Sequence, residues 1–308
     1  MRMLTGLFVS IMTIGAGLIL HGAGSEVAPE LRYMSFNIWG DYFKNPVSER
    51  RQGVAETILK QDADVVGLQE VTKGWWSSGL FEELVGRYAV VTGDVEVALK
   101  RAGADFLHRK SGWGNYEPLL IRRDKFSLLD SGIEYLHLAL DETKGVTWAV
   151  LEDKLNARRY IVFSTHFWWQ SNGKESDVIR ELNARTIIGV MRELKSKWGD
   201  IPVIGGGDLN SVRGTLAMNA FAVSGYCDAA ETADVRSCIP SEHLDPKRGS
   251  DGRYHGVAGD PTNQNNYMLD HVMYFGKIRA VRHEVVVDQV ALDVSDHSPV
   301  VVDFISVK

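Results

Sequence analysis

The sequence contains none of the short motifs that mark several common catalytic chemistries. It has no CxxC or HExxH pattern for zinc, no GxxxxGK[ST] phosphate loop and no GxSxG nucleophile elbow. These absences argue against a zinc enzyme, a P-loop nucleotidase and a hydrolase with a serine elbow.

Cysteine is also scarce. The 308 residues include only Cys227 and Cys238, and both lie in one polar, loop-like segment. In an oxidising compartment these two residues would form a disulfide, which we predict here. Two free, unreactive thiols are the alternative.

An excess of positive charge is missing. There are 34 Lys and Arg residues against 40 Asp and Glu residues, so the formal net charge is −6. The sequence also lacks a long basic arm. Its charge therefore gives no overall attraction to nucleic acid, although a local basic patch could still exist.

No apolar run is long enough for a transmembrane helix, which needs roughly 20 residues. The longest mostly apolar stretch, Leu7–Leu20, follows Arg2 and precedes a group of small residues. This arrangement predicts a signal peptide over residues 1–24, with an uncleaved N-terminal anchor as the alternative. We therefore expect a secreted or periplasmic protein. Residues 25–308 should form a single domain, because no repeat or linker divides them.

The clearest positive feature is the stretch Ile201–Ser211, IPVIGGGDLNS. Its apolar residues predict a short buried strand, and the three glycines look like the breaker that ends it. Asp208 and Asn210 would then lie at the carboxyl end of the strand, where open α/β sheets bind ligands. Two positions apart in extended backbone, they would point the same way and could share a metal or a phosphoryl oxygen. A simple Asx-turn is the alternative.

Other predicted strands end in the same way. Hydrophobic patterning predicts strands at 31–36, 65–68, 88–92, 117–121, 146–152, 160–165, 268–275, 280–287 and 300–305. It predicts helices at about 46–60, 79–85, 177–198 and 214–223, and loops at 93–114 and 226–266. The alternation indicates an α/β domain.

Polar residues at the strand ends form a recurring set. They are Asn37, Glu70, Glu117, His166, Asp208, Asn210, Asp270, Asp296 and His297. Carboxylates, amides and imidazoles gathered at one edge of a sheet suit Mg²⁺, with Mn²⁺ or Ca²⁺ also possible. Together with the missing motifs, this set predicts hydrolysis by metal-activated water without a covalent intermediate.

Six segments in order resemble the endonuclease/exonuclease/phosphatase superfamily: FNIWG, VGLQEV, STHFWW, GGGDLNS, MLDHVMY and VSDHSPV. The resemblance runs from about Leu31 to Ile305. It implies a deoxyribonuclease-I-like α/β fold, a four-layer sandwich in which two packed mixed or antiparallel sheets are flanked by helices. It also implies a Mg²⁺-dependent hydrolase of phosphoric ester bonds, and the signal peptide suggests a secreted, bacterial-type member.

The resemblance assigns metal-binding roles to three residues. Glu70 resembles the family's metal-binding glutamate, and Asn37 the asparagine that holds a metal ligand or a phosphate oxygen. Asp296, in the terminal SDH signature, is a possible second metal ligand. The structural alternatives are a surface glutamate after a strand for Glu70 and a turn asparagine for Asn37.

Five further residues match catalytic positions. His166 resembles the histidine that donates to a non-bridging phosphate oxygen or assists the leaving group. Asp208 and Asn210 resemble the pair that orients the nucleophilic water and the phosphate. His297 would be a general base or an electrostatic clamp, and Asp270 the acid that fixes its tautomer. A satisfied core histidine and a core ion pair are the structural alternatives.

Four residues are candidates for contact with the substrate. Glu117 resembles a glutamate of the nuclease branch and could orient His166, or it is a plain strand-edge residue. Trp39 and Trp168 could stack on a base, a sugar or a choline-like cation, or pack under loops. His255 resembles a substrate-side histidine found in parts of the family; a solvated loop histidine is the alternative.

We therefore expect a secreted phosphodiesterase or phosphatase that acts as a monomer, without a stable protein partner, on small or lipid head-group phosphate esters. One alternative is a secreted nuclease acting on DNA or RNA. A second is a non-catalytic binding protein on the same scaffold. Trp39 stands where abasic-site repair endonucleases of the superfamily commonly carry an acid, which argues against a repair role.

Overall fold

A computed structural model of the chain describes residues 28–42, 45–94, 115–136, 144–263 and 267–307. The predicted signal peptide and most of the predicted loop at 93–114 lie outside these residues. Within the described ranges, no helix has the length and apolar character needed to cross a membrane.

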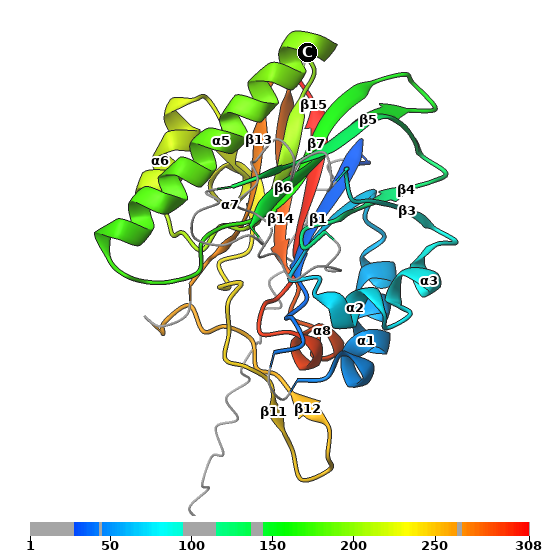
Figure 1. The fold of residues 1–308 in the computed structure, drawn as a ribbon, viewed down its shortest axis with the longest axis vertical. Helices are drawn as coiled ribbons and strands as arrows, with labels where there is room; N and C mark the ends of the chain where they lie inside the picture. Colours follow the sequence, from blue (N-terminus) through cyan, green and yellow to red (C-terminus); the bar gives the residue numbers. More distant parts are fainter. Residues whose placement is uncertain (1–27, 43–44, 95–114, 137–143, 264–266, 308) are drawn as a thin grey trace, which may run out of the picture.

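A seven-stranded mixed sheet contains the start and the end of the described chain (Figure 1). Its strand order is β10-β14-β15-β1-β2-β4-β3. The strands are β1 (Leu31–Asn37), β2 (Val65–Gln69), β3 (Tyr88–Val91), β4 (Leu119–Arg122), β10 (Val235–Arg236), β14 (Ile278–Val285) and β15 (Val300–Ser306). Strand β1 is parallel to β2 and antiparallel to β15.

A six-stranded mixed sheet has the order β5-β6-β7-β8-β13-β9. Its strands are β5 (Phe126–Tyr135), β6 (Gly145–Asp153), β7 (Arg159–His166), β8 (Val203–Asp208), β9 (Cys227–Asp228) and β13 (Asp270–Phe275). Strand β8 is parallel to β7 and antiparallel to β13. A separate hairpin pairs β11 (Lys247–Arg248) with β12 (Tyr254–His255).

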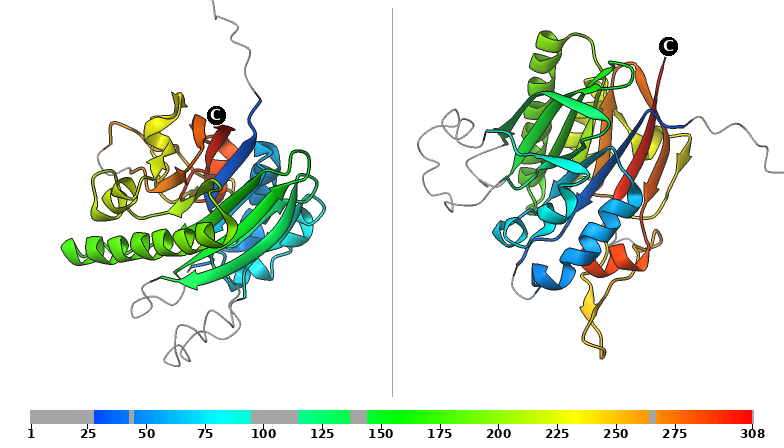
Figure 2. Two further views of the ribbon diagram at one scale, coloured as in Figure 1. Left: turned by 90° about the horizontal axis from the view of Figure 1, so that it is seen from above. Right: turned by 90° about the vertical axis from the view of Figure 1, so that its right-hand side faces the viewer.

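Helices cover the outer faces of both sheets (Figure 2). They are α1 (Val47–Gln61), α2 (Lys73–Trp76), α3 (Leu80–Leu84) and α8 (Gln289–Val294) on the seven-stranded sheet, and α5 (Lys174–Trp198) and α6 (Leu216–Val223) on the six-stranded sheet. The short helix α7 (Ala229–Thr232) instead buries Ala229 between the sheets. One hydrophobic cluster fills the space between the sheets. A second joins the seven-stranded sheet to α1, α3 and α8, and a third joins the six-stranded sheet to α5 and α6. Three stacked cores confirm the predicted four-layer sandwich.

The prediction that the three glycines of GGGD end their strand is wrong. Gly205, Gly206 and Gly207 are the middle of β8, which continues to Asp208. Strands β7 and β13 flank β8 so closely that a Cβ at Gly206 would collide with the carbonyl oxygen of His271. A Cβ at Gly207 would collide with the carbonyl oxygen of Thr165. Glycine is therefore required here by close backbone approach.

We predict that Gly206→Ala lowers the free energy of unfolding by roughly 1–3 kcal/mol or more, because the methyl group has no space and its neighbour is backbone. Gly189→Ala on α5 is the matched control, because a Cβ there meets nothing within 4 Å. We expect Gly189→Ala to be neutral or to stabilise the protein by up to about 1 kcal/mol. Urea unfolding followed by circular dichroism measures both, and equal stabilities would contradict the crowding argument.

The predicted disulfide does not form, since Cys227 and Cys238 are both free thiols. Cys227 lies on β9 of the six-stranded sheet. The chain then passes through α7 to β10, which pairs with β14 in the other sheet, before it reaches the exposed Cys238. Closeness in sequence suggested pairing, but the intervening segment crosses from one sheet to the other.

Candidate active site

The polar strand ends meet at one edge of the two sheets. In the six-stranded sheet, Asp208 at the end of β8 is paired with His166 on one side and Asp270 on the other. In the seven-stranded sheet, Asn37 at the end of β1 is paired with Gln69, the residue before Glu70. The predicted alignment of strand ends therefore brings these side chains together.

Asn37 joins the two sheets through its side-chain amide. Its Nδ2 donates to Oδ2 of Asp208 at 3.1 Å and to Oε1 of Glu70 at 3.2 Å. Its Oδ1 accepts the backbone N–H of Trp39 at 3.0 Å, and the N–H of Gly40 donates to Oε2 of Glu70 at 2.7 Å. The loop after β1 thus holds the Glu70 carboxylate in place.

Asp208 lies between two imidazoles. Its Oδ2 is 3.2 Å from Nε2 of His166 and 3.8 Å from Nε2 of His297, and all three residues are buried. Burial alone would raise the pKa of Asp208, but the two histidines outweigh it and hold that pKa below the usual range of a carboxyl group. The backbone N–H of Asn210 donates to Oδ1 at 2.9 Å. Asp208 is therefore a fixed, ionised carboxylate.

His297 and Asp270, which the sequence suggested as a dyad, are hydrogen-bonded to each other. Nδ1 of His297 lies 2.7 Å from Oδ2 of Asp270, so Nε2 faces Asp208. Burial would lower the pKa of His297, but the carboxylates of Asp270 and Asp208 raise it well above its ordinary value. The two carboxylates therefore favour the protonated form of His297.

Two serines that sequence reasoning missed support this dyad. Ser295 accepts the N–H of His297 at 3.1 Å and donates to the carbonyl of Asn37 at 2.6 Å. Ser241 accepts the N–H of Asp270 at 3.0 Å. Ser295 lies within the VSDHSPV segment and could have been noted there, whereas Ser241 carries no local signal.

Glu70 and Asp296 form an acidic side of the site beside the dyad. Burial, together with the nearby carboxylates of Glu70 and Asp245, raises the pKa of Asp296 to about 7, against the opposite effect of His297. Within the described residues, no three His, Cys, Asp or Glu side chains already have the geometry of a complete metal site. Mg²⁺ commonly binds through one or two carboxylates and keeps several waters, so this donor set fits it.

Backbone strain is concentrated at the same place. Trp39, Glu70 and Asn210 have φ values of 54°, 62° and 46°, in the left-handed region that side chains rarely adopt. Each directly follows or nearly follows the end of a strand in the site. Such clustering is typical of functional sites, where the surrounding structure enforces the conformation.

We predicted that Glu117 could orient His166 through a hydrogen bond, but the structure contains no such bond between these two described residues. Nδ1 of His166 has no hydrogen-bond partner among the described residues, so Glu117 does not bond to it. The imidazole instead stacks on the ring of Tyr116, with centroids 5.9 Å apart and planes at 17°. Glu117 itself is fully buried. Tyr116 lies fifty residues before His166 and carried no signal for this contact.

The aromatic and histidine candidates for substrate contact are dispersed. Trp39 is half-buried beside the Asn37–Glu70 pair. Trp168 is only 8% exposed, whereas its neighbour Trp169 is 58% exposed. His255 is exposed on β12, and its Nε2 lies 3.0 Å from Oδ1 of Asp251.

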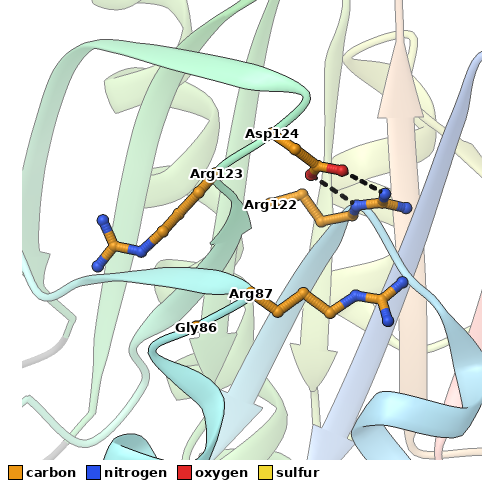
Figure 3. A pocket seen from close by; sticks show the side chains of 5 residues that line it. All are labelled: Gly86, Arg87, Arg122, Arg123 and Asp124. Carbon is orange, nitrogen blue, oxygen red and sulfur yellow. Dashed lines mark hydrogen bonds and ion pairs between the residues drawn. The ribbon is translucent and has the colours of Figure 1, made fainter.

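An arginine-lined cavity of about 710 Å³ lies away from this site (Figure 3). It is bordered by Arg87, Arg122 and Arg123. These residues lie near the first residue of β2, whereas Glu70 follows the last residue of β2, so the cavity and the candidate site are at opposite ends of this strand. Arg122 donates to both carboxylate oxygens of Asp124, at 2.8 and 3.1 Å. Arg87 and Arg122 also pair with Asp62. The acidic partners make this an internally compensated ion-pair cluster.

Comparisons with known proteins agree with the geometry. A family model described as the Endonuclease/Exonuclease/phosphatase family matches residues 34–297. The mannosyl-6-phosphatase of Bacteroides thetaiotaomicron is 20% identical, with 89% of this chain and 99% of that chain covered and a TM-score of 0.66. At this identity the match shows a common fold.

Two curated proteins are similar in sequence over part of their length. The inositol phosphosphingolipids phospholipase C of Schizosaccharomyces pombe is 47% identical over 60 residues, 19% of this chain and 13% of that protein. Carbon catabolite repressor protein 4 homolog 3 of Arabidopsis thaliana is 22% identical over 241 residues, 72% of this chain and 50% of that protein. The chain thus spans at most half the length of these relatives.

The family model covers most of the chain, and the residues that converge at the sheet edge come from the segments that suggested the resemblance. Members of this family are hydrolases that act on phosphoric ester bonds. The chain belongs to the Endonuclease/Exonuclease/phosphatase family.

Proposed function

We propose that this protein is a secreted or periplasmic, metal-dependent hydrolase of small or head-group phosphate esters that works as a monomer. The observation that carries the proposal is the convergence of the Asp270–His297 dyad, Asp208 and the Asn37–Glu70 pair at one sheet edge. A binding protein on a disused scaffold would commonly have lost one of these groups.

Glu70, Asn37 and Asp296 are the residues that would hold the divalent cation, with Mg²⁺ the first choice. The raised pKa of Asp296 reflects burial and an excess of negative charge beside Glu70, which a cation would relieve. When bound there, the cation would offset the charge that develops on the phosphoryl oxygens. Mn²⁺ or Ca²⁺ would suit the same oxygen donors.

Asp208 is placed to accept a hydrogen bond from the attacking water. His166 and His297 keep it ionised, and Asn210 fixes its orientation. A carboxylate of low pKa is a weak base, so its main contribution is to orient the water in line with the phosphorus.

His297 serves better as an electrostatic clamp than as a general base. Its raised pKa leaves a proton on Nε2, which can donate to a phosphoryl oxygen as negative charge develops. Asp270 fixes the ring through Nδ1 and stabilises the imidazolium. His166 is the second donor, positioned for a phosphoryl oxygen or the leaving group.

The preference for small or head-group esters rests on charge and on relatives. Duplex DNA binding draws much of its affinity from Lys and Arg, whereas this chain has a formal net charge of −6. Two similar proteins carry names that refer to a mannosyl 6-phosphate and to inositol phosphosphingolipids.

A kinetic panel at fixed ionic strength tests the proposal. It compares hexose phosphates, inositol phosphates, phosphocholine lipids, small diesters, RNA and plasmid DNA, each with Mg²⁺ and with EDTA. We expect the highest kcat/KM on a small or head-group ester. If plasmid DNA gives the highest value and its cleavage falls steeply with salt, the nuclease alternative is correct. If no substrate turns over with Mg²⁺, the binding-protein alternative is correct.

A further inference from the structure

A pocket of about 510 Å³ opens beside the catalytic edge. It is lined by Trp39, Tyr42, Asn45, Asp245, Pro246, Lys247, Arg248 and Tyr254. Trp39, Tyr42 and Asn45, which follow β1, form one wall, and the other is the β11–β12 hairpin, which projects from the end of the molecule next to α8 (Figure 1). This volume lies within the roughly 300–1,000 Å³ of small-molecule sites.

Both walls continue directly into the catalytic residues. Trp39 donates its backbone N–H to Asn37, and the next residue donates to Glu70. On the other side, the backbone N–H of His243, two residues before Asp245, donates to the carbonyl of Asp296 at 3.0 Å. A phosphate held at Glu70 and His297 would therefore present its alcohol group to this pocket.

The aromatic walls are held rigidly. Arg50 packs its guanidinium 4.9 Å from the ring centroids of both Trp39 and Trp75, and donates to the carbonyls of Trp39 and Ile38. Arg248 lies 4.7 Å from the ring of Tyr254 and is anchored by Glu49 at 2.7 Å. The Trp39 and Tyr254 rings meet edge to face, 6.3 Å apart. The pocket is consequently preformed.

Three polar groups of the pocket have no partner within the described part of the chain. The carboxylate of Asp245 and the ammonium of Lys247 are exposed and make no hydrogen bond or ion pair there. Oδ1 of Asn45 is buried and accepts no hydrogen bond, while its Nδ2 donates to the carbonyl of Gly40 at 2.6 Å. The pocket thus offers two acceptors and one donor.

This set of groups discriminates among ligand chemistries. A second phosphate would be repelled by Asp245, and the guanidinium of Arg248 is already committed to Glu49. Hydroxyl groups both donate and accept, so they can satisfy Asp245, Asn45 and Lys247 together. The apolar face of a saturated ring can pack against Trp39 and Tyr254.

We propose that this pocket binds the polyhydroxylated ring of the alcohol that carries the phosphate, so that the preferred substrate is a sugar or inositol phosphate. The inference rests on the proposed function, since it assigns the alcohol side of the same site. Asp245 and Lys247 are the residues that determine specificity, through hydrogen bonds to ring hydroxyls.

The test compares each polyol ester with an analogue that lacks ring hydroxyls. One arm pairs myo-inositol 1-phosphate with cyclohexyl phosphate, and the other pairs a hexose 6-phosphate with cyclohexylmethyl phosphate. We expect the wild-type protein to favour the polyol in at least one arm by roughly 10-fold or more in kcat/KM, as expected for hydrogen bonds to charged groups. The arm with the larger ratio identifies the source of the ring.

Asp245→Ala and Lys247→Ala should each reduce that ratio by about 10-fold, mainly through a higher KM for the polyol ester. Arg253→Ala is the matched control, because it removes an exposed cation from the same hairpin without lining the pocket. The ratio of kcat/KM on the polyol ester to kcat/KM on the analogue should be the same in Arg253→Ala as in the wild type.

Different results would disprove the proposed function and the proposed role of the pocket. If neither polyol nor analogue is hydrolysed with Mg²⁺, the proposed function fails. If the analogues turn over and the ratios stay near one in the wild type, or do not change in Asp245→Ala and Lys247→Ala, the pocket inference is wrong while the proposed function stands.

Discussion

Replacing His297 with alanine is expected to lower kcat/KM by on the order of 10²–10⁴-fold while the fold is retained. The substitution removes the cation that Asp270 and Asp208 hold between them. Steady-state kinetics with Mg²⁺ on the best substrate measures the loss, and circular dichroism checks the fold. Added imidazole should restore part of the activity, because the cavity it would fill is created by the substitution.

The pH dependence decides which role His297 has. A clamp must be protonated, so kcat/KM should fall as the pH rises through the raised pKa of His297. A general base must be neutral, so kcat/KM would fall as the pH is lowered instead. His297→Gln keeps a hydrogen-bond donor that does not titrate, and it should lose the alkaline decline. Full activity in His297→Ala would exclude both roles.

Glu70→Gln is expected to produce the second large effect, a loss of Mg²⁺ affinity of more than roughly 100-fold. Removing a residue that only supports a metal ligand costs roughly 10–100-fold, and removing a ligand itself should cost more. The carboxylate is held by Asn37 and Gly40 and lies beside Asp296, so we expect its charge to provide the main attraction for the proposed cation. Calorimetric titration of Mg²⁺ measures the affinity without relying on turnover. Activity should recover in part at high Mg²⁺.

Glu82→Gln is the matched control for this change, because it removes the same charge from an exposed residue of α3. Its Mg²⁺ affinity and activity should equal those of the wild type. If Glu70→Gln also binds Mg²⁺ like the wild type, the cation does not bind at Glu70 and the assignment of the acidic side is wrong.

Much of the site could be predicted because it is built at strand ends. An apolar run followed by a polar residue identifies such an end, and neighbouring strands bring Asp208, His166 and Asp270 together by register. The end of β8 was predicted wrongly, because its three glycines were taken as a strand breaker. Close backbone packing requires glycine there, and the strand continues through these residues.

Other features depend on tertiary contacts that leave no local pattern. Tyr116 meets His166 only because β4 and β7 lie in facing sheets. The β11–β12 hairpin was read as loop, since strands of two residues show no periodicity. Trp168 is buried and the adjacent Trp169 is exposed, and their positions in the STHFWW segment do not indicate this difference.

Metal-dependent hydrolysis is measured most directly as the release of nitrophenol by the purified wild-type protein. A nitrophenyl phosphomonoester and a nitrophenyl phosphodiester are each assayed with Mg²⁺, with EDTA, and with EDTA followed by excess Mg²⁺. We expect turnover of at least one of them with Mg²⁺, its loss in EDTA and its recovery when Mg²⁺ is restored. Turnover that continues unchanged in EDTA would show that the proposed metal dependence is wrong, because the acidic side of Glu70 and Asp296 would then have no part in the chemistry.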